Sequence, residues 1–421
     1  MTTARPELEL RGRWQLDELE EAHNAFRRWL GEDYDIDALD ALLCAFAAER
    51  LDGDPLWMLL ISGPGNAKTE TIQAAAGIGA HIVSTVTGEA ALLSATSQRE
   101  RTKNATGGLL RKIGASGMLV IKDVTSILSM NRDARAGVLA ALREIHDGHW
   151  SRDVGTDGGQ SLKWSGRLIV IGACTTAWDQ AHTAISAMGD RFVLLRMDST
   201  KGRMAAGRKS IGNTGSETKM RTELAAAVAN VVAGCNPKLD LSLTDEETEH
   251  LLAAANLVTL ARTGVEYDYR GDVIDAHAPE MPTRFGKQLA QIMRGGISIG
   301  VPRRRALNLA LRSARDSMPP LRLAIILEIA ANPDSATRDV RKRLNKPRAT
   351  VDRQLQALHM LEVLDCEEDE DFHRGQPATI WRYRLADGID PNALNSVPEM
   401  LVDTPRPQEK GDQSDESRTT L

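Results

Sequence analysis

The sequence predicts an α/β fold built on a mainly parallel sheet, with helical segments after it. Five short apolar runs alternate with helix-like stretches between residues 56 and 200. Strands separated by helices pair in parallel, and helices then cover both faces of the sheet. After residue 216 the pattern is helical only, up to Pro319-Pro320. The strand candidates are 57–62, 81–86, 117–122, 167–173 and 192–197.

Length and composition bound the number of domains. The 421 residues are too many for one core, and 42% of them are hydrophobic, which is enough to build several. We expect N-terminal helices over 1–50, an α/β core over 51–200, a helical segment over 201–316 with a loop at 200–216, and a compact segment over 317–386. The remainder, 387–421, is rich in Pro, Asp, Glu, Ser and Thr, so we expect a disordered tail.

Charge and cysteine content exclude several classes. A net charge of -6 argues against a uniformly basic coat for nucleic acid, although a local basic face stays compatible with it. The four cysteines are scattered, without a C-x-x-C pair, which argues against disulfides and zinc and favours a reducing compartment. The N-terminus lacks an apolar signal core, and the apolar runs are too short to span a membrane. We expect a cytoplasmic protein without a membrane partner.

The first strand candidate leads into a loop that is typical of phosphate binding. Such loops point backbone N–H groups inward and carry a lysine for the outer phosphates and a hydroxyl for Mg²⁺. Here Lys68 and Thr69 fill the last two roles, while Ser62 and Ala67 replace two glycines of the usual pattern. We expect ordinary helical torsions at Ala67, just inside a helix. The predicted loop for ATP and Mg²⁺ consists of Ser62, Gly63, Pro64, Gly65, Asn66, Ala67, Lys68, Thr69 and Glu70.

A second element is expected on a neighbouring strand, where an apolar run ends in an acid that holds the metal. Residues 117–122 lead to Asp123, and Val124 follows where many ATPases have a glutamate that polarises the attacking water. Either Asp123 is the metal acid and the base lies elsewhere, or Asp123 takes the glutamate's place and Lys122 has replaced the metal acid. Hydrolysis could then be slow.

With both elements placed, the chain resembles the AAA+ ATPases over roughly residues 35–315. It is similar to the branch with a hairpin before the sensor strand, which includes the MCM helicases and the bacterial enhancer-binding activators. The stretch LREIHDGHWSRDVGTDGGQSLKWSGRLIVIGACTT, residues 142–176, is similar to that branch's helix, hairpin and sensor strand, with Thr175 or Thr176 as the polar sensor. The motif MGDRFVLLRMD resembles an MCM motif and implies that Arg191 is an arginine finger.

The resemblance also implies a homo-oligomeric ring or filament, because an arginine finger acts on a neighbouring subunit's γ-phosphate. The helical segment 201–316 would be the lid of the nucleotide site, and MPTRFGKQLAQI would place Arg284 as its second sensor. Tyr34 and Ile36 lie where the family often packs the adenine, although a core role fits them at least as well. The overall likeness points to ATPases of phages and integrated mobile elements.

The segment 317–386 resembles a winged helix-turn-helix, with three helices and then a two-stranded wing. In that fold the third helix enters the major groove of DNA through its N-terminal part. Basic residues outnumber acids from 302 to 354, as phosphate binding requires, but Glu367–Asp371 would put five acids at the wing tip. The DNA-contacting candidates are Arg338, Arg341, Lys342, Arg343, Arg348, Thr350, Arg353 and Gln354.

These features predict an AAA+ ATPase that acts on DNA, such as a helicase or loader in the replication or maintenance of a mobile element. Two alternatives stay open. One is a nucleotide-gated transcription regulator with little turnover. The other is a degenerate ATPase fold that serves as an oligomeric scaffold without hydrolysis. For the segment 317–386, the alternative to DNA binding is that it binds protein or docks against the lid. The missing glutamate favours the alternatives, whereas Arg191 and the hairpin favour the ATPase.

Overall fold

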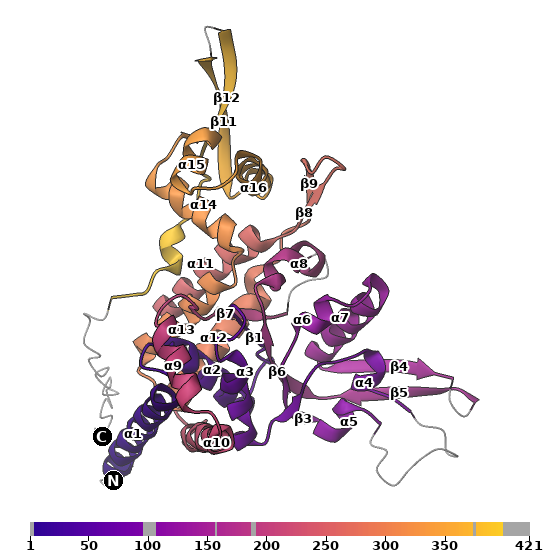
Figure 1. The fold of residues 1–421 in the computed structure, drawn as a ribbon, viewed down its shortest axis with the longest axis vertical. Helices are drawn as coiled ribbons and strands as arrows, with labels where there is room; N and C mark the ends of the chain where they lie inside the picture. The colour runs from indigo at the N-terminus through magenta and orange to yellow at the C-terminus, as the bar shows by residue number, and fades with distance from the viewer. Residues whose placement is uncertain (1–3, 96–106, 156–157, 187–190, 374–375, 399–421) are drawn as a thin grey trace, which may run out of the picture.

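The computed structural model describes residues 4–95, 107–155, 158–186, 191–373 and 376–398, and Figure 1 shows its arrangement. Its centre is a five-stranded parallel sheet in the order β2-β3-β6-β1-β7. Each strand begins within one residue of its predicted start, so the α/β class is confirmed. The strands are β1 (Met58–Ile61), β2 (His81–Val83), β3 (Ser116–Ile121), β6 (Arg167–Cys174) and β7 (Val193–Arg196).

The order of the strands corrects one expectation. Strand β6 lies between β1 and β3, so the strand that leads to Asp123 does not neighbour the strand that leads to the loop. Met58 pairs with Ile171 of β6 on one side and with Val193 of β7 on the other. Chain order does not reveal such an inserted strand. The ends of β1, β6 and β3 therefore lie side by side at the carboxyl edge of the sheet.

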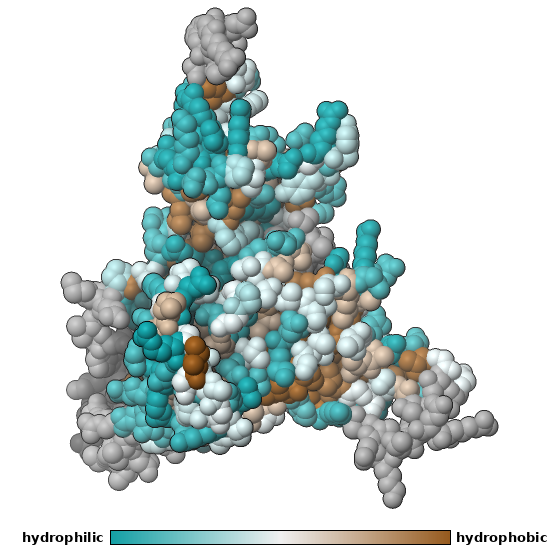
Figure 2. Space-filling model, viewed as in Figure 1, coloured by the Kyte–Doolittle hydropathy of each residue, from teal (hydrophilic) through white to brown (hydrophobic). Residues whose placement is uncertain are grey.

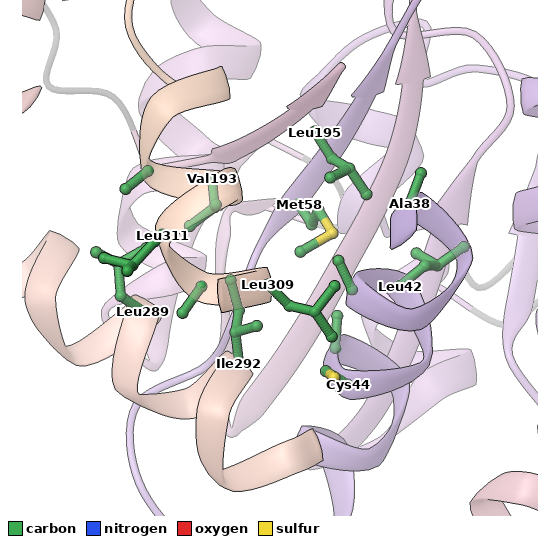
Figure 3. Packing of buried hydrophobic residues seen from close by; sticks show 14 of the residues in the cluster. Ala38, Leu42, Cys44, Met58, Val193, Leu195, Leu289, Ile292, Leu309 and Leu311 are labelled. Atoms are coloured by element: carbon green, nitrogen blue, oxygen red, sulfur yellow. The ribbon is translucent and has the colours of Figure 1, made fainter. Parts of the chain in front are cut away.

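Each face of the sheet belongs to a separate core, because neighbouring residues of a strand point to opposite faces. Met58 and Leu60 pack with α2 (Ile36–Ala47), α12 (Pro282–Ser298) and α13 (Arg303–Asp316), as Figure 3 shows for part of this core. Leu59 and Ile61 face the second core, to which α7 (Arg132–His146) contributes. Both faces are covered, as predicted.

Smaller elements surround the core. The N-terminal helix α1 (Ala4–Leu30) precedes α2, and α3 (Lys68–Gln73) continues into the 3-10 turn η2 (Ala74–Ile78). The predicted hairpin is present as β4 (His149–Val154) and β5 (Gln160–Ser165), in antiparallel pairing. The remaining short helices of this half are η1 (Ala48–Arg50), α4 (Glu89–Leu92), α5 (Leu109–Ile113), α6 (Thr125–Leu128) and α8 (Ala177–Ser186).

The segment after the sheet differs from the predicted run of helices. Helix α9 (Arg203–Gly212) occupies the expected loop, because its Met, Ala, Arg and Lys residues favour helix despite nearby glycines. Helix α10 (Glu217–Ala233) and α11 (Asp245–Arg262) follow as expected. A hairpin of β8 (Val265–Tyr267) and β9 (Val273–Ala276), rich in β-favouring side chains, then interrupts the helices. Two helices, α12 and α13, complete this segment. They are separate because Gly300, at φ +87°, and Pro302 lie between them.

The C-terminal segment contains three helices and a three-stranded antiparallel sheet, in the order β10-β12-β11. The acidic run lies along β11 and not at the tip of the hairpin, and β12 compensates part of it. Arg382 Nε donates to Asp369 at 2.6 Å, and Arg384 lies 2.5 Å from Glu367. The elements are α14 (Pro320–Ala331), β10 (Ser335–Ala336), α15 (Thr337–Arg343), α16 (Arg348–Met360), β11 (Leu364–His373) and β12 (Gln376–Leu385).

The first part of the expected tail is folded. Residues Pro391–Leu394 form a 3-10 turn, η4, with Leu394 buried. The backbone N–H of Val397 donates to Asn308 Oδ1 on α13 at 2.8 Å. The expectation of disorder is therefore wrong for 387–398, because an apolar side chain inside the polar stretch anchors it; 399–421 lie outside the described residues. Among the described helices, none has the length and apolar character to cross a bilayer.

Candidate functional site

The loop after β1 lies at the carboxyl edge of the sheet and is held from two sides. The backbone N–H of Ser62 donates to the carbonyl of Cys174, at the end of β6, at 3.4 Å. On the other side, Asn66 Nδ2 donates to the carbonyl of Asp198, just after β7, at 3.1 Å. Gly65 has φ +78°, a torsion that glycine adopts without strain. The loop is thus fixed by the two strands that flank β1.

Ala67 departs from the expected conformation. It has φ 52° and ψ 3°, which is left-handed, and α3 begins only at Lys68. A side chain at such a residue costs roughly 1–2 kcal/mol because Cβ crowds the following carbonyl. The expected helical torsions are therefore wrong. The glycine that Ala67 replaces is the residue that this geometry favours.

We predict that Ala67→Gly stabilises the protein. Relief of the left-handed strain outweighs the extra entropy of glycine in the unfolded chain, for a net gain of about 0.5–1 kcal/mol. Urea denaturation measures the change in the free energy of unfolding. The matched control is Ala76→Gly, an exposed residue of η2 outside the left-handed region, which should lose stability. A loss in both variants would contradict the strain at Ala67.

Lys68 folds back onto its own loop. Its Nζ donates to the carbonyls of Gly63 at 2.7 Å and Ser62 at 3.0 Å, and to Ser62 Oγ at 3.1 Å. The side chain is 8% exposed. Burial lowers the pKa of Lys68, and the negative charges that Cys174 and Asp123 carry when ionised oppose the shift. The amine is therefore held inside the loop, within electrostatic reach of Asp123.

Asp123 and Thr175 reach the same edge from β3 and β6. The carboxylate of Asp123 is exposed and accepts the backbone N–H of Thr125 at 3.0 Å. Thr125 Oγ1 accepts the backbone N–H of Thr175 at 3.2 Å and lies 3.5 Å from Thr175 Oγ1. Thr175 Oγ1 also accepts from the backbone of Ala177, at the start of α8, at 3.4 Å, so it caps that helix as well. Thr125 links the acid to the sensor candidate, a role that the sequence did not suggest.

The polar groups of this edge fit Mg²⁺ bound together with phosphates. Magnesium prefers oxygen ligands and usually takes one or two from the protein, with phosphates and water supplying the others. The hydroxyl of Thr69 and the carboxylate of Asp123 are both exposed here. Within the described residues there is no cluster of three or more His, Cys, Asp or Glu side chains for a metal. A site completed by a nucleotide does not need such a cluster.

A network of charged residues flanks the loop and escaped the sequence analysis. Arg312, from α13, binds Asp35 at the start of α2 through two hydrogen bonds of 2.7 and 2.6 Å. Arg196, at the end of β7, donates to Asp179 at 2.7 and 3.0 Å and through its backbone to Asp316 at 2.8 Å. The network ties the helical segment to the carboxyl edge of the sheet. The sequence offered one sign of this network, because Arg196 is a charged residue at the end of an apolar strand.

Asp316 predicts a pH dependence of stability. Burial raises its pKa from 3.8 to about 6, against the positive charge of Arg312. The unfolded chain therefore releases this proton at a lower pH than the folded chain does. As a result, the free energy of unfolding falls as pH rises from about 4 to 6. The loss is on the order of 3 kcal/mol for this group. Asp316→Asn lacks this titrating group, so in urea denaturation the wild type should lose stability relative to the variant as pH rises over that range. The control is Asp17→Asn at an exposed residue, and its difference in stability from wild type should not change with pH.

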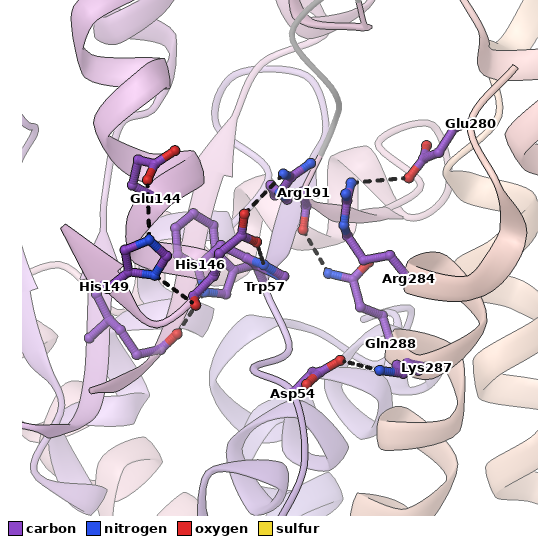
Figure 4. Close-up of polar contacts among 12 residues, drawn as sticks. Asp54, Trp57, Glu144, His146, His149, Arg191, Glu280, Arg284, Lys287 and Gln288 are labelled. Atoms are coloured by element: carbon purple, nitrogen blue, oxygen red, sulfur yellow. Dashed lines mark hydrogen bonds and ion pairs between the residues drawn. The ribbon is translucent and has the colours of Figure 1, made fainter. Parts of the chain in front are cut away.

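Arg191 and Arg284 lie together at the opposite edge of the sheet (Figure 4). Arg191 precedes β7, which runs parallel to β1, so it lies beyond the amino ends of these strands, away from Lys68. Arg191 Nη2 lies 3.4 Å from Asp147, and its carbonyl accepts from Gln288 of α12 at 2.7 Å. Burial and the charge of Arg284 lower the pKa of Arg191. The structure therefore brings Arg284 to Arg191 and not to the loop of its own chain.

The tryptophans of the β4–β5 hairpin and Tyr34 have packing roles. Trp150 and Trp164 of the hairpin are 8% and 7% exposed, and Trp164 Nε1 donates to the carbonyl of Gly114 at 2.7 Å. They therefore support the hairpin and do not face outward, whereas Lys163 is exposed. Tyr34 lies beside the loop, with its hydroxyl 2.8 Å from Thr71 of α3.

Glu70, the last residue of the predicted loop, already has a partner in this structure. Arg221 of α10 binds its carboxylate through two hydrogen bonds of 2.8 and 2.9 Å.

The DNA-contacting candidates divide into exposed and engaged residues. Arg348 and Thr350 are exposed on the first turn of α16, and Arg338 and Lys342 on α15. In contrast, Arg343 binds Glu328 of α14, and Arg353 contacts Arg270 in the turn of the β8–β9 hairpin. Gln354 contacts Tyr267 of β8 and also Arg322 of α14. Arg341 is partly buried. The structure therefore leaves the start of α16 open.

A comparison with protein-family models and with curated proteins gives no match. Among solved structures, the A-form apo structure of the NrS-1 C-terminal region has 10% sequence identity and a TM-score of 0.27. The match covers 87% of this chain and 75% of that one. A second A-form apo structure of that region has the same identity and coverage and a TM-score of 0.25. These scores are too low to establish a common fold, and no function is transferred from them.

Proposed function

We propose that this chain binds ATP with Mg²⁺ at the loop of residues 62–70 and acts on DNA as an ATPase of the AAA+ class. One observation carries the nucleotide site. Three parallel strands end at one edge with a lysine loop, an acid and a threonine: Lys68 after β1, Asp123 after β3 and Thr175 after β6. Ligands of open parallel sheets bind outside the carboxyl ends of the strands, where these groups lie.

The proposed roles follow from the chemistry of each group. Lys68 neutralises the outer phosphates once it leaves the carbonyls of Ser62 and Gly63, and the loop N–H groups bind the phosphate oxygens. Thr69 and Asp123 would hold Mg²⁺, which would supply positive charge for the phosphates. Thr175 orients the γ-phosphate or the attacking water, and Thr125 keeps it in place.

A second copy of the chain completes the site. Arg191 lies too far from Lys68 of its own chain, at the opposite edge of the sheet. In a head-to-tail ring or filament, the amino edge of one sheet meets the carboxyl edge of the next, so Arg191 and Arg284 reach the neighbour's nucleotide. Their positive charge would stabilise the transferring phosphate group.

The C-terminal segment supplies the proposed contact with DNA. Its elements follow the order helix, strand, helix, helix and hairpin, as expected for a winged helix-turn-helix. Helix α16 begins with exposed Arg348 and Thr350, and the basic α15 lies against it. We therefore place α16 in the major groove. Stated concretely, the proposed function is that of a helicase or loader of a phage or mobile element.

A nucleotide-gated regulator of transcription is the second candidate. The buried Val124 stands where a water-polarising glutamate is common, and the carboxylate of Asp123 is engaged by its own backbone turn. Both features favour slow turnover, in which bound ATP acts as a switch. A non-hydrolysing scaffold would share them.

Steady-state ATP hydrolysis, measured alone and with duplex or single-stranded DNA, separates these candidates. The proposed ATPase turns over ATP, faster with DNA, and its specific activity rises with protein concentration because the site needs two copies. A folded protein that binds ATP without turnover in any condition would support the switch. If the folded protein does not bind nucleotide, the non-hydrolysing scaffold is the remaining candidate.

A further inference from the structure

The β8–β9 hairpin of the helical segment lies along α16, the proposed DNA-reading helix (Figure 1). Arg353 Nη2 donates to the carbonyl of Arg270, in the hairpin turn, at 2.9 Å. A Cβ at Gly271 would lie 2.8 Å from Arg353 Cζ, so the guanidinium packs directly on the turn. The hairpin therefore occupies the side of α16 from which Arg353 projects.

Gln354 is engaged from two sides, by Arg322 of α14 in its own segment and by Tyr267 of the hairpin. Its Oε1 accepts from Arg322 Nε at 2.9 Å, and its Nε2 lies 3.5 Å from the hydroxyl of Tyr267 in β8. Arg322 is 5% exposed and donates to the carbonyls of Ala261, in the last turn of α11, and of Thr263, just after that helix. A glutamine reads adenine with both groups of its amide. In this conformation both groups already have partners.

The hairpin is acidic where DNA would approach. Residues 265–276 carry four acids, Glu266, Asp268, Asp272 and Asp275, against one base, Arg270. Of these acids, Glu266, Asp272 and Asp275 are exposed. In Figure 2 the hairpin is teal to pale, and the adjoining C-terminal segment is mainly teal, with hydrophobic residues toward its base. Phosphates beside α16 would meet this negative charge, which opposes the attraction of the basic residues.

We propose that the β8–β9 hairpin competes with duplex DNA for α16 and must leave it before Arg353 can contact bases. Gln354 loses its contact with Tyr267 at the same time but keeps the one with Arg322. The inference rests on the proposed DNA-binding role of α16. With the hairpin in place, exposed Arg348 and Thr350 still allow backbone contacts, so binding is weak and insensitive to sequence. The apparent affinity is then reduced by the fraction of molecules in which α16 is uncovered.

The contact is suited to displacement. The turn of the hairpin touches α16 through polar contacts with Arg353. The other end of the hairpin is held in the core by Val265, which is buried. Tyr269, at the turn, is 87% exposed and lies under the guanidinium of Arg270, 5.1 Å from the ring centroid. The turn can therefore move without opening the core.

The test is the affinity of the full chain for a labelled duplex of mixed sequence, measured by fluorescence anisotropy. In the main variant, residues 268–272 are replaced by Asn-Gly, which closes a tight hairpin turn. We expect its Kd to fall about tenfold, because the covered state is lost. In a second variant, Glu266→Gln with Asp275→Asn, the hairpin keeps its length but loses an exposed cross-strand pair of acids, and a smaller gain is expected. Glu20→Gln with Glu21→Gln on α1 changes the charge equally, far from α16, and should match wild type.

The outcomes separate this inference from the function on which it rests. Tighter binding by the shortened hairpin, with the α1 control unchanged, supports the competition. Equal affinity of wild type and both hairpin variants overturns it and leaves the DNA-binding role intact. Absence of DNA binding in wild type and in every variant at low salt overturns the proposed role of α16, and the inference with it.

Discussion

Lys68→Ala is expected to weaken ATP binding about 100-fold or more, because it removes several charge-assisted hydrogen bonds to the phosphates. Isothermal titration with ATP and Mg²⁺ measures the loss. The variant also leaves the carbonyls of Ser62 and Gly63 without their amine, so its fold must be checked by circular dichroism. Lys112→Ala, at an exposed lysine of α5, is the matched control and should bind as wild type does.

The interpretation of the loop depends on this result. Retained tight binding by a folded Lys68→Ala protein would show that the phosphates lie elsewhere. The positions of Thr69 and Asp123 at the same edge would then have no common ligand to explain them.

Arg191→Ala is expected to leave ATP affinity unchanged and to lower kcat by about 10³-fold, the usual effect of an arginine finger. Its side chain is 11% exposed and paired with Asp147, so the fold of the variant must be checked by circular dichroism. Steady-state turnover measures the loss. Arg132→Ala, at an exposed residue of α7, is the control and should retain full activity.

Mixing the two inactive variants tests whether the site is shared. In a mixed assembly, about a quarter of the interfaces join an intact Lys68 to an intact Arg191 if subunits combine at random. Activity should therefore return on mixing Lys68→Ala with Arg191→Ala. An inactive mixture that still oligomerises, or an Arg191→Ala protein with normal turnover, would remove Arg191 from the site.

The sheet could be predicted because its signal is local. Each strand is an apolar run between polar stretches, and burial on both faces makes such runs continuous, as in 167–173. The loop of 62–70 was equally visible, because its residue types are similar to those of phosphate-binding loops. The proposed roles of these residues stay predictions.

Features that depend on tertiary contacts could not be predicted. Ala67 adopts left-handed torsions that alanine itself disfavours, so its residue type did not indicate them. The place of Arg284 depends on how α12 packs against the amino edge of the sheet, and the sequence gives only its position in a motif. The engagement of Arg353 by the β8–β9 hairpin joins residues that lie 83 apart in the chain.

The most direct measurement is an experimental structure of the protein with a non-hydrolysable ATP analogue and Mg²⁺. We expect the β- and γ-phosphates to lie in the loop of 62–70, with Lys68 Nζ released from the carbonyls of Ser62 and Gly63. We also expect Thr69 and Asp123 to hold Mg²⁺. A nucleotide bound elsewhere, with Lys68 still on those carbonyls, would contradict the proposed nucleotide site.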